Sequence, residues 1–212
     1  MKMTGKVILA CVSMLGCTGA FAAENAGAGI DWKARLPEIR SVVQQTFPRE
    51  TAEAHYPASI SRTADLTGTG ESEALVDLGS GEYTDEFTVV RMEGDTPVVA
   101  RFRSGKDEKA APMVFLSGQS EGKGEAVELR PREHVIYTGH WLVSGTGNGM
   151  KVKKCHGEAY EWDAESKSFS LSKKMGKVLT REFCQKLVAD AAKAQQVPGP
   201  EDPAKPAAQK LD

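Results

Sequence analysis

Residues 65–79 read DLTGTGESEALVDLG and join a glycine-containing turn directly to an apolar segment. Glycine supplies backbone conformations with positive φ, and an aspartate at the start of a turn can accept hydrogen bonds from backbone amides a few residues later. The apolar residues 74–76 and Leu78 then follow two glutamates. This order predicts a polar turn that leads into a strand, and the rest of the chain is interpreted around it.

Beyond residue 79, short apolar segments recur about every ten residues and are separated by glycine-rich turns. Residues 98–103 alternate in the manner of a half-buried strand, and residues 87–92 are the expected hairpin partner. No helix of crossover length separates these segments, which argues against a parallel sheet. The predicted fold class is therefore α+β: a mainly antiparallel β-sheet or sandwich with an N-terminal and a C-terminal helix.

Two amphipathic segments flank the β region. The first is predicted to begin near Pro37 and to end at Pro48, because proline fits poorly inside a helix. The second is predicted to begin at Thr180, a residue type that caps helices well. The apolar stripes that define the two helices are Trp32, Leu36, Ile39, Val43 and Phe47 for the first, and Phe183, Cys184, Leu187, Val188 and Ala191 for the second.

The N-terminal residues have the features of an export signal. Lys2 and Lys6 precede a short apolar run at 7–16, and Ala20, Phe21 and Ala22 supply a cleavage site. We therefore expect a signal peptide (1–22), a spacer (23–30), a single α+β domain (31–196) and a disordered Pro- and Ala-rich tail (197–212). The expected location is the periplasm or the exterior. A retained membrane anchor and a lipoprotein attached through Cys17 are the alternatives.

Two of the four cysteines lie in the leader, which leaves Cys155 and Cys184 in the predicted domain. In an oxidising compartment these two are expected to form a disulfide that fixes the second helix to the strand carrying Cys155. Two buried free thiols are the alternative. Neither cysteine belongs to a C-x-x-C pair, so the sequence does not indicate a redox enzyme.

The charge balance and the motifs exclude several functional classes. A net charge of -2 with both signs mixed along the chain predicts no nucleic-acid partner, and no membrane span is expected after signal cleavage. Residues 118–122 match G-x-S-x-G, but a strand pattern follows, so Ser120 is interpreted as a loop residue. His55, His134, His140 and His156 show no metal-binding spacing. Tyr137, Trp141, Tyr160 and Trp162 are interpreted as core residues rather than the wall of a groove.

The turn at Asp65 has the spacing of a calcium loop. Asp65, Thr67, Thr69, Gly70 and Glu73 follow the pattern D-x-D-x-D-G-x-x-D. The turn resembles the FG-GAP type of calcium loop, found in integrin α chains and bacterial propeller-like repeats, in a single copy. The resemblance implies calcium as a cofactor, with Asp65 and Glu73 as the main ligands, assisted by Thr67 and Thr69. Because two expected acids are threonines, a metal-free β-turn is the favoured alternative and no cofactor is expected.

A second resemblance concerns the whole region from Asp65 to Phe183. The segments DLTGTGESEALVDLG, VVARF, CHGEAYEWD and SFSLS are similar to those of uncharacterised exported bacterial proteins. This resemblance implies a location outside the cytosol and a fold, but no activity. The functional hypothesis is a non-enzymatic periplasmic binding or accessory protein, whose partner is an envelope protein or a small ligand. A cell-envelope hydrolase and a calcium-stabilised interaction module are the alternatives.

Overall fold

The computed structural model describes residues 29–79, 84–105, 108–120, 122–145 and 151–194. The predicted leader and tail lie outside these ranges. No helix among the described residues combines the length and apolarity needed to cross a bilayer. The helices are α1 (Leu36–Thr46), α2 (Pro48–Ala52) and α3 (Lys173–Ala194). The strands are β1 (Ser59–Ala64), β2 (Glu73–Asp77), β3 (Thr84–Glu93), β4 (Thr96–Val99), β5 (Arg101–Arg103), β6 (Ala111–Pro112), β7 (Phe115–Ser120), β8 (Lys123–Arg130), β9 (Val135–Ser144), β10 (Lys151–Asp163) and β11 (Ser168–Leu171).

The turn at Asp65 joins β1 and β2 as an antiparallel pair, in which Ala64 lies opposite Glu73. Successive side chains of a strand point to opposite faces. Ala74 and Val76 accordingly pack towards α1, whereas Leu75 packs on the other face of the sheet. The prediction that a polar turn leads into a buried strand is confirmed.

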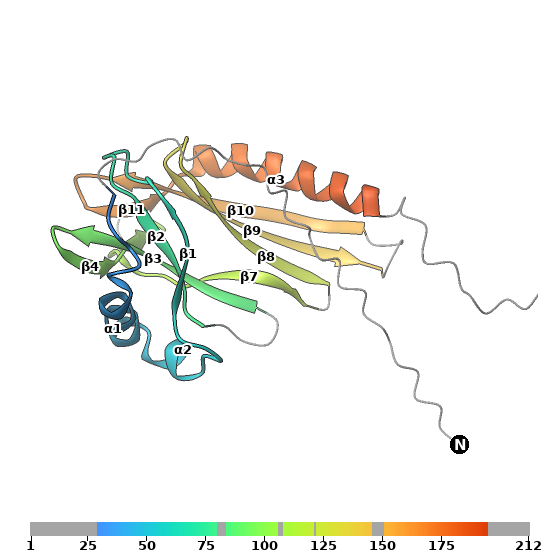
Figure 1. Ribbon diagram of the computed structural model, residues 1–212. Coiled ribbons are helices and arrows are strands. Elements are labelled where there is room, and N and C mark those ends of the chain that lie inside the picture. The colour runs from blue at the N-terminus through green and yellow to red at the C-terminus, as the bar shows by residue number, and fades with distance from the viewer. Residues whose placement is uncertain (1–28, 80–83, 106–107, 121, 146–150, 195–212) are drawn as a thin grey trace, which may run out of the picture.

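The strands form one sheet in the order β1-β2-β3-β7-β8-β9-β10-β11-β5-β6, with β4 paired to β3 (Figure 1). Every pair is antiparallel except β11 with β5. Only Ala100 separates β4 from β5, and its N–H donates to the Val89 carbonyl at 2.8 Å. Because β4 pairs with β3 and β5 pairs with β11, the sheet closes on itself. The predicted α+β class with a mainly antiparallel sheet is confirmed.

The closed part of the sheet surrounds an aromatic core. The Phe102 ring contacts Phe115 at 5.0 Å, Phe169 at 5.2 Å and Tyr160 at 5.5 Å between centroids. These rings come from β5, β7, β11 and β10, so one cluster joins four strands. Such aromatic pairs add about 0.5–1.5 kcal/mol each beyond the area they bury. The remaining buried members of this cluster are Leu66, Leu75, Phe87, Val89, Ala100, Leu129 and Ile136.

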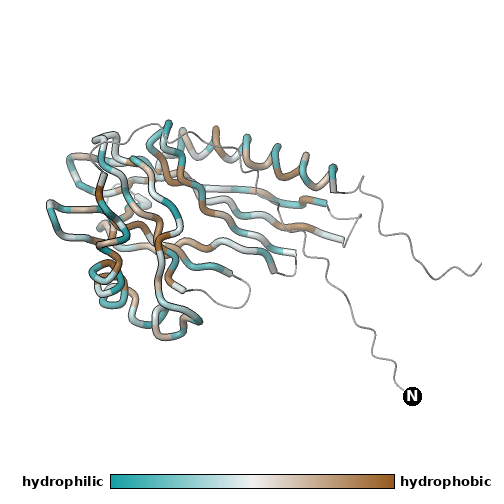
Figure 2. The backbone as a smooth tube through the Cα atoms, viewed as in Figure 1, coloured by the Kyte–Doolittle hydropathy of each residue, from teal (hydrophilic) through white to brown (hydrophobic). Residues whose placement is uncertain are grey.

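Two helices cover the outer face of the sheet at separate places. Ile39 and Val43 of α1 are fully buried against β2 and β3. Leu179 and Phe183 of α3 are buried against β9 and β10. In Figure 2 apolar and polar residues alternate along α3, as expected for a helix with one buried side. The first helix was predicted to end at Pro48. In the structure α1 ends just before this residue, and Pro48 begins the short α2, which fits the preference for proline in a first helical turn.

The predicted C-terminal helix, α3, begins earlier than expected, at Lys173 rather than Thr180. The Met175 N–H donates to the Ser172 hydroxyl at 3.3 Å, which caps the first turn. Glycine is unfavourable inside a helix, but Gly176 lets α3 lie close to β10. A Cβ at this position would lie 3.7 Å from the Ala159 nitrogen. Thr180 is instead an interior residue, and its hydroxyl donates to the Gly157 carbonyl at 3.3 Å.

A disulfide joins Cys155 of β10 to Cys184 of α3, with the Cα atoms 5.9 Å apart. The predicted covalent link between the C-terminal helix and a strand is confirmed, and the alternative of two free thiols is wrong. Because Cys155 is in the disulfide, it cannot also serve as a thiolate zinc ligand beside His156. The bond fixes the middle of α3 against β10.

Replacing both cysteines, C155A with C184A, should lower the free energy of unfolding. The loop spans 29 residues in sequence, for which chain entropy gives about 3–4 kcal/mol. Urea unfolding of both proteins with and without dithiothreitol measures this difference. Reductant should destabilise the wild-type protein and leave the double variant unchanged. Equal stability of the wild-type protein and the double variant, both measured without dithiothreitol, would contradict a stabilising role for the disulfide.

Candidate functional site

The turn after β1 is organised by the carboxylate of Asp65. One oxygen, Oδ1, accepts hydrogen bonds from the Gly68 N–H at 2.7 Å and the Thr67 N–H at 3.2 Å. The other, Oδ2, accepts from the Gly70 N–H at 3.0 Å. Gly68 and Gly70 have φ of 72° and 86°, in the region that glycine adopts readily. Both oxygens of Asp65 are therefore used to hold the backbone of the turn.

Glu73 closes the same turn from the start of β2. Its side chain is buried, and its two oxygens accept from the Leu66 N–H at 2.7 Å and the Thr67 hydroxyl at 3.2 Å. Burial raises the pKa of Glu73, and these two hydrogen bonds oppose that effect. The Thr67 and Thr69 hydroxyls lie 2.9 Å apart. The structure therefore brings together Asp65, Thr67, Thr69 and Glu73, the four predicted calcium ligands.

Calcium binding at this turn stays a prediction of the sequence resemblance. Within the described ranges, no three His, Cys, Asp or Glu side chains are arranged to hold a metal. A calcium ion would also have to compete with backbone N–H groups for the oxygens of Asp65 and Glu73. In the structure, oxygens of both carboxylates hold the backbone of the turn.

Thermal unfolding in calcium and in chelator should give the same midpoint, because the carboxylates are already hydrogen bonded. A ligand that binds only the folded protein raises the midpoint when present in excess over its Kd. Magnesium is the control for nonspecific cation effects. A calcium-specific increase that EGTA reverses, and that D65N abolishes, would contradict this expectation and assign a calcium site to the turn.

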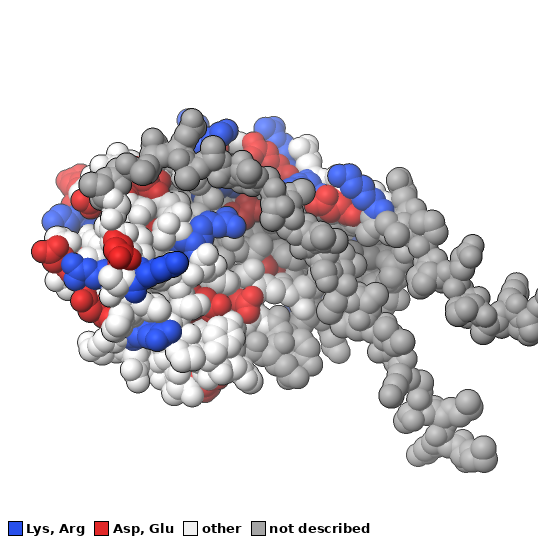
Figure 3. Space-filling model, viewed as in Figure 1, with Lys and Arg blue, Asp and Glu red and all other residues white. Residues whose placement is uncertain are grey.

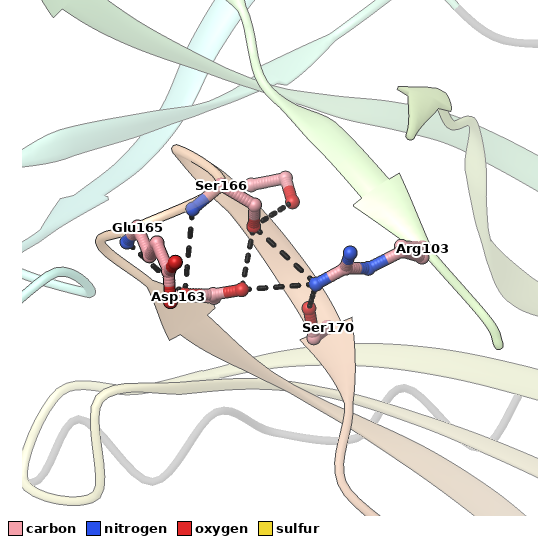
Figure 4. Close-up of polar contacts among 6 residues, drawn as sticks. Arg103, Asp163, Glu165, Ser166 and Ser170 are labelled. Carbon is pink, nitrogen blue, oxygen red and sulfur yellow. Dashed lines mark hydrogen bonds and ion pairs between the residues drawn. The ribbon is translucent and has the colours of Figure 1, made fainter. Parts of the chain in front are cut away.

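A second polar cluster surrounds Arg103 of β5 (Figure 4). Its Nη2 donates to Asp163 Oδ2 at 2.9 Å, to the Ser170 hydroxyl at 3.0 Å and to the Ser166 hydroxyl at 3.4 Å. The hydrogen bond from the Ser166 hydroxyl, 2.6 Å long, is the main cause that lowers the pKa of Asp163. Because Asp163 ends β10 and Ser166 lies within the β10–β11 turn, the cluster fastens that turn to β5. None of its hydrogen bonds involves a histidine, so it has no general base of that type.

The structure also locates the motif residues considered in the sequence. Ser120 is the last residue of β7 rather than part of a loop, and β8 follows in a hairpin, so the nucleophile-elbow geometry is absent here. His134 lies in the turn before β9, and its Nδ1 is 3.3 Å from the Asp65 carbonyl oxygen. Tyr137, Trp141 and Tyr160 are buried, as predicted, whereas Trp162 is half-buried and packs against the edge of the core.

Three residues on adjacent strands form a polar row that the sequence did not reveal. His140 of β9 lies opposite both Glu125 of β8 and His156 of β10. The two imidazole rings stack with centroids 5.0 Å apart, and His140 Nδ1 lies 3.2 Å from Glu125 Oε1. The only signal for this row is strand register, because the spacing of 16 residues between the histidines has no meaning without the hairpin.

A groove runs between α3 and the edge of β10. Its volume is about 540 Å³. It is formed by the end of β11, the middle of β10 and one side of α3. The lining residues are His156, Gly157, Glu158, Leu171, Ser172, Lys173, Gly176, Lys177, Thr180, Arg181 and Cys184. Cys184 belongs to the disulfide, so a covalent bond fixes one wall of the groove to the other.

The floor of the groove is a strand edge that no described strand covers. β10 pairs with β9 from Lys151 to Glu161, but with β11 only from Tyr160 to Asp163. Beyond Tyr160, towards Lys151, the edge opposite β9 therefore has no strand partner among the described residues. Such an edge presents backbone N–H and C=O groups that can pair with another chain.

One wall of the groove is cationic. Lys173, Lys177 and Arg181 follow one another at four-residue intervals, so they lie on the same side of α3. Glu158 is the one acidic side chain in the lining. Elsewhere both signs are mixed, and Figure 3 shows blue and red side chains interspersed on the visible face, along α3 as well. The groove thus differs in charge from a chain whose net charge is -2.

Comparison of the chain with protein-family models, with curated proteins and with solved structures gave no match. The functional argument therefore rests on the geometry of the groove between α3 and β10.

Proposed function

We propose that this chain is an exported, non-enzymatic binding protein and that the groove between β10 and α3 is its binding surface. The observation that carries the proposal is a strand edge without a strand partner in the described ranges, which lies beside a basic helix face and is held there by a disulfide. Grooves of several hundred Å³ are typical of ligand sites. Export is supported by the leader pattern at 1–22 and by the disulfide, because such bonds persist in oxidising compartments.

The alternative of an envelope hydrolase requires a nucleophile held next to a base. Among the described residues, the side-chain hydrogen bonds of histidine go to the Asp65 carbonyl and to Glu125, and neither partner is a serine or cysteine. The Arg103 cluster contains serines but serves the β10–β11 turn. These contacts support a binding function over a hydrolytic one.

Native mass spectrometry of protein purified gently from the cell envelope tests the proposed function. Wild-type protein should retain a bound component in a fixed ratio, and the groove variant K177E with R181E should lose it. The matched control is K174E with K186E, which makes the same charge change on α3 outside the groove lining. The control should retain the component.

Equal retention by all three proteins would contradict the groove as the binding surface. Turnover of an envelope substrate by the pure protein, abolished by a single side-chain change, would contradict the non-enzymatic assignment. In either case circular dichroism should first show that the variants are folded.

A further inference from the structure

We infer that the groove takes an acidic, extended peptide segment, which adds to β10 as a further strand in line with β11. The inference rests on the proposed function and names the chemistry of the partner. It follows from two independent features of the groove: the direction of the backbone groups on its floor, and the charge of its helical wall.

The direction of the backbone groups follows from the hydrogen bonds of the paired part of β10. The Ser172 N–H donates to the Ala159 carbonyl at 2.7 Å, so Ala159 directs its polar backbone groups to the β11 side. In an antiparallel strand these groups alternate between the two edges from one residue to the next. Gly157 and Cys155 therefore direct their N–H and C=O groups to the same edge. No described strand pairs with them there.

The position of β11 shows where an added strand would lie. β11 ends at Leu171, opposite Tyr160, and the chain then turns into α3. The space along β10 from Glu158 to Cys155 is thus the continuation of the line that β11 occupies. Leu171 and Ser172 line one end of the groove, which agrees with this placement.

The charge of the wall selects the side chains of the partner. Lys173, Lys177 and Arg181 overlook the edge from α3, and all three are exposed. Lysines on β10 itself, Lys153 and Lys154, add to the positive charge beyond the groove. Charge complementarity of this kind accelerates association and selects partners. An acidic peptide is therefore preferred over a neutral or basic one.

The strand edge also distinguishes an acidic peptide from other polyanions as a ligand. A nucleic acid, polyphosphate or sulfated sugar could be attracted by the cationic wall, but none offers a repeating row of amide donors and acceptors. In strand addition, main-chain hydrogen bonds supply affinity and side chains supply specificity. The Gly157 carbonyl already accepts a hydrogen bond from the Thr180 hydroxyl at 3.3 Å, and the Gly157 N–H and the backbone groups of Cys155 have no strand partner among the described residues. Only another polypeptide offers the alternating donors and acceptors that match them.

Fluorescence anisotropy with labelled eight-residue peptides tests the inference on the full mature chain. The probe alternates glutamate and valine. The first control carries lysine in place of glutamate, and the second keeps the glutamates but is N-methylated at every residue, which removes all amide donors. The glutamate peptide should bind saturably, and the N-methylated peptide at least tenfold more weakly. K177E with R181E should weaken binding at least tenfold, and K174E with K186E less than twofold.

Each other outcome overturns the inference. Equal binding of the N-methylated peptide would show anion adsorption without strand pairing. Equal binding of the lysine peptide would remove the role of charge, and equal binding by the groove variant would place the peptide elsewhere. Absence of binding by the glutamate peptide would reject the inference, but retention of a native component that depends on Lys177 and Arg181 would still uphold the proposed function.

Discussion

The arrangement of β10 is the constraint on which the proposed binding surface depends. This strand of 13 residues is longer than the four-residue β11 that pairs with its second edge, so part of that edge is left open. The helix that follows β11 returns across the sheet, and Cys184 ties it to Cys155. Gly176 allows α3 to approach β10 closely, and the Thr180 hydroxyl reaches the Gly157 carbonyl at 3.3 Å. The groove lies where the helix is held beside a strand edge that no described strand covers.

Closure of the sheet through β4 and β5 holds β11 in its position on β10. Ala100 divides one run of chain into β4 and β5, which pair with different partners. Phe102 then packs against rings from three other strands, and Arg103 fastens the β10–β11 turn. These contacts fix the end of β11, and so fix the point at which pairing along β10 stops. The packing of the core thus sets the length of the β10 edge that β11 leaves without a strand partner.

Local patterns in the sequence account for much of the fold. Alternation in residues 98–103 and the expected hairpin with residues 87–92 predicted strands there, because one-sided burial imposes a period of two. The pairing of Cys155 with Cys184 followed from the small number of cysteines in the predicted mature chain. The predicted start of α3 was wrong, because Thr180 has a side chain typical of helix caps but lies inside the helix, whereas the Ser172 hydroxyl caps the first turn. The parallel pairing of β5 with β11 leaves no local signal.

The candidate site was less accessible from sequence than the fold. Motif reasoning selected Asp65 and Ser120, whose residue types are informative by themselves. The groove depends instead on where β11 ends relative to β10, and on which side of α3 carries Lys177 and Arg181. The stacked pair of His140 and His156 likewise depends on register. Surfaces built from backbone edges can be recognised only after the strands are aligned.

Residue-resolved hydrogen exchange of the protein, without any added ligand, tests the central claim most directly. The amides of His156 and Glu158 face β9 in the paired ladder and should exchange slowly, whereas those of Gly157 and Cys155 should exchange rapidly at the open edge. This alternation is the predicted result. Slow exchange at all four amides would show that the edge is already covered, and would contradict the account.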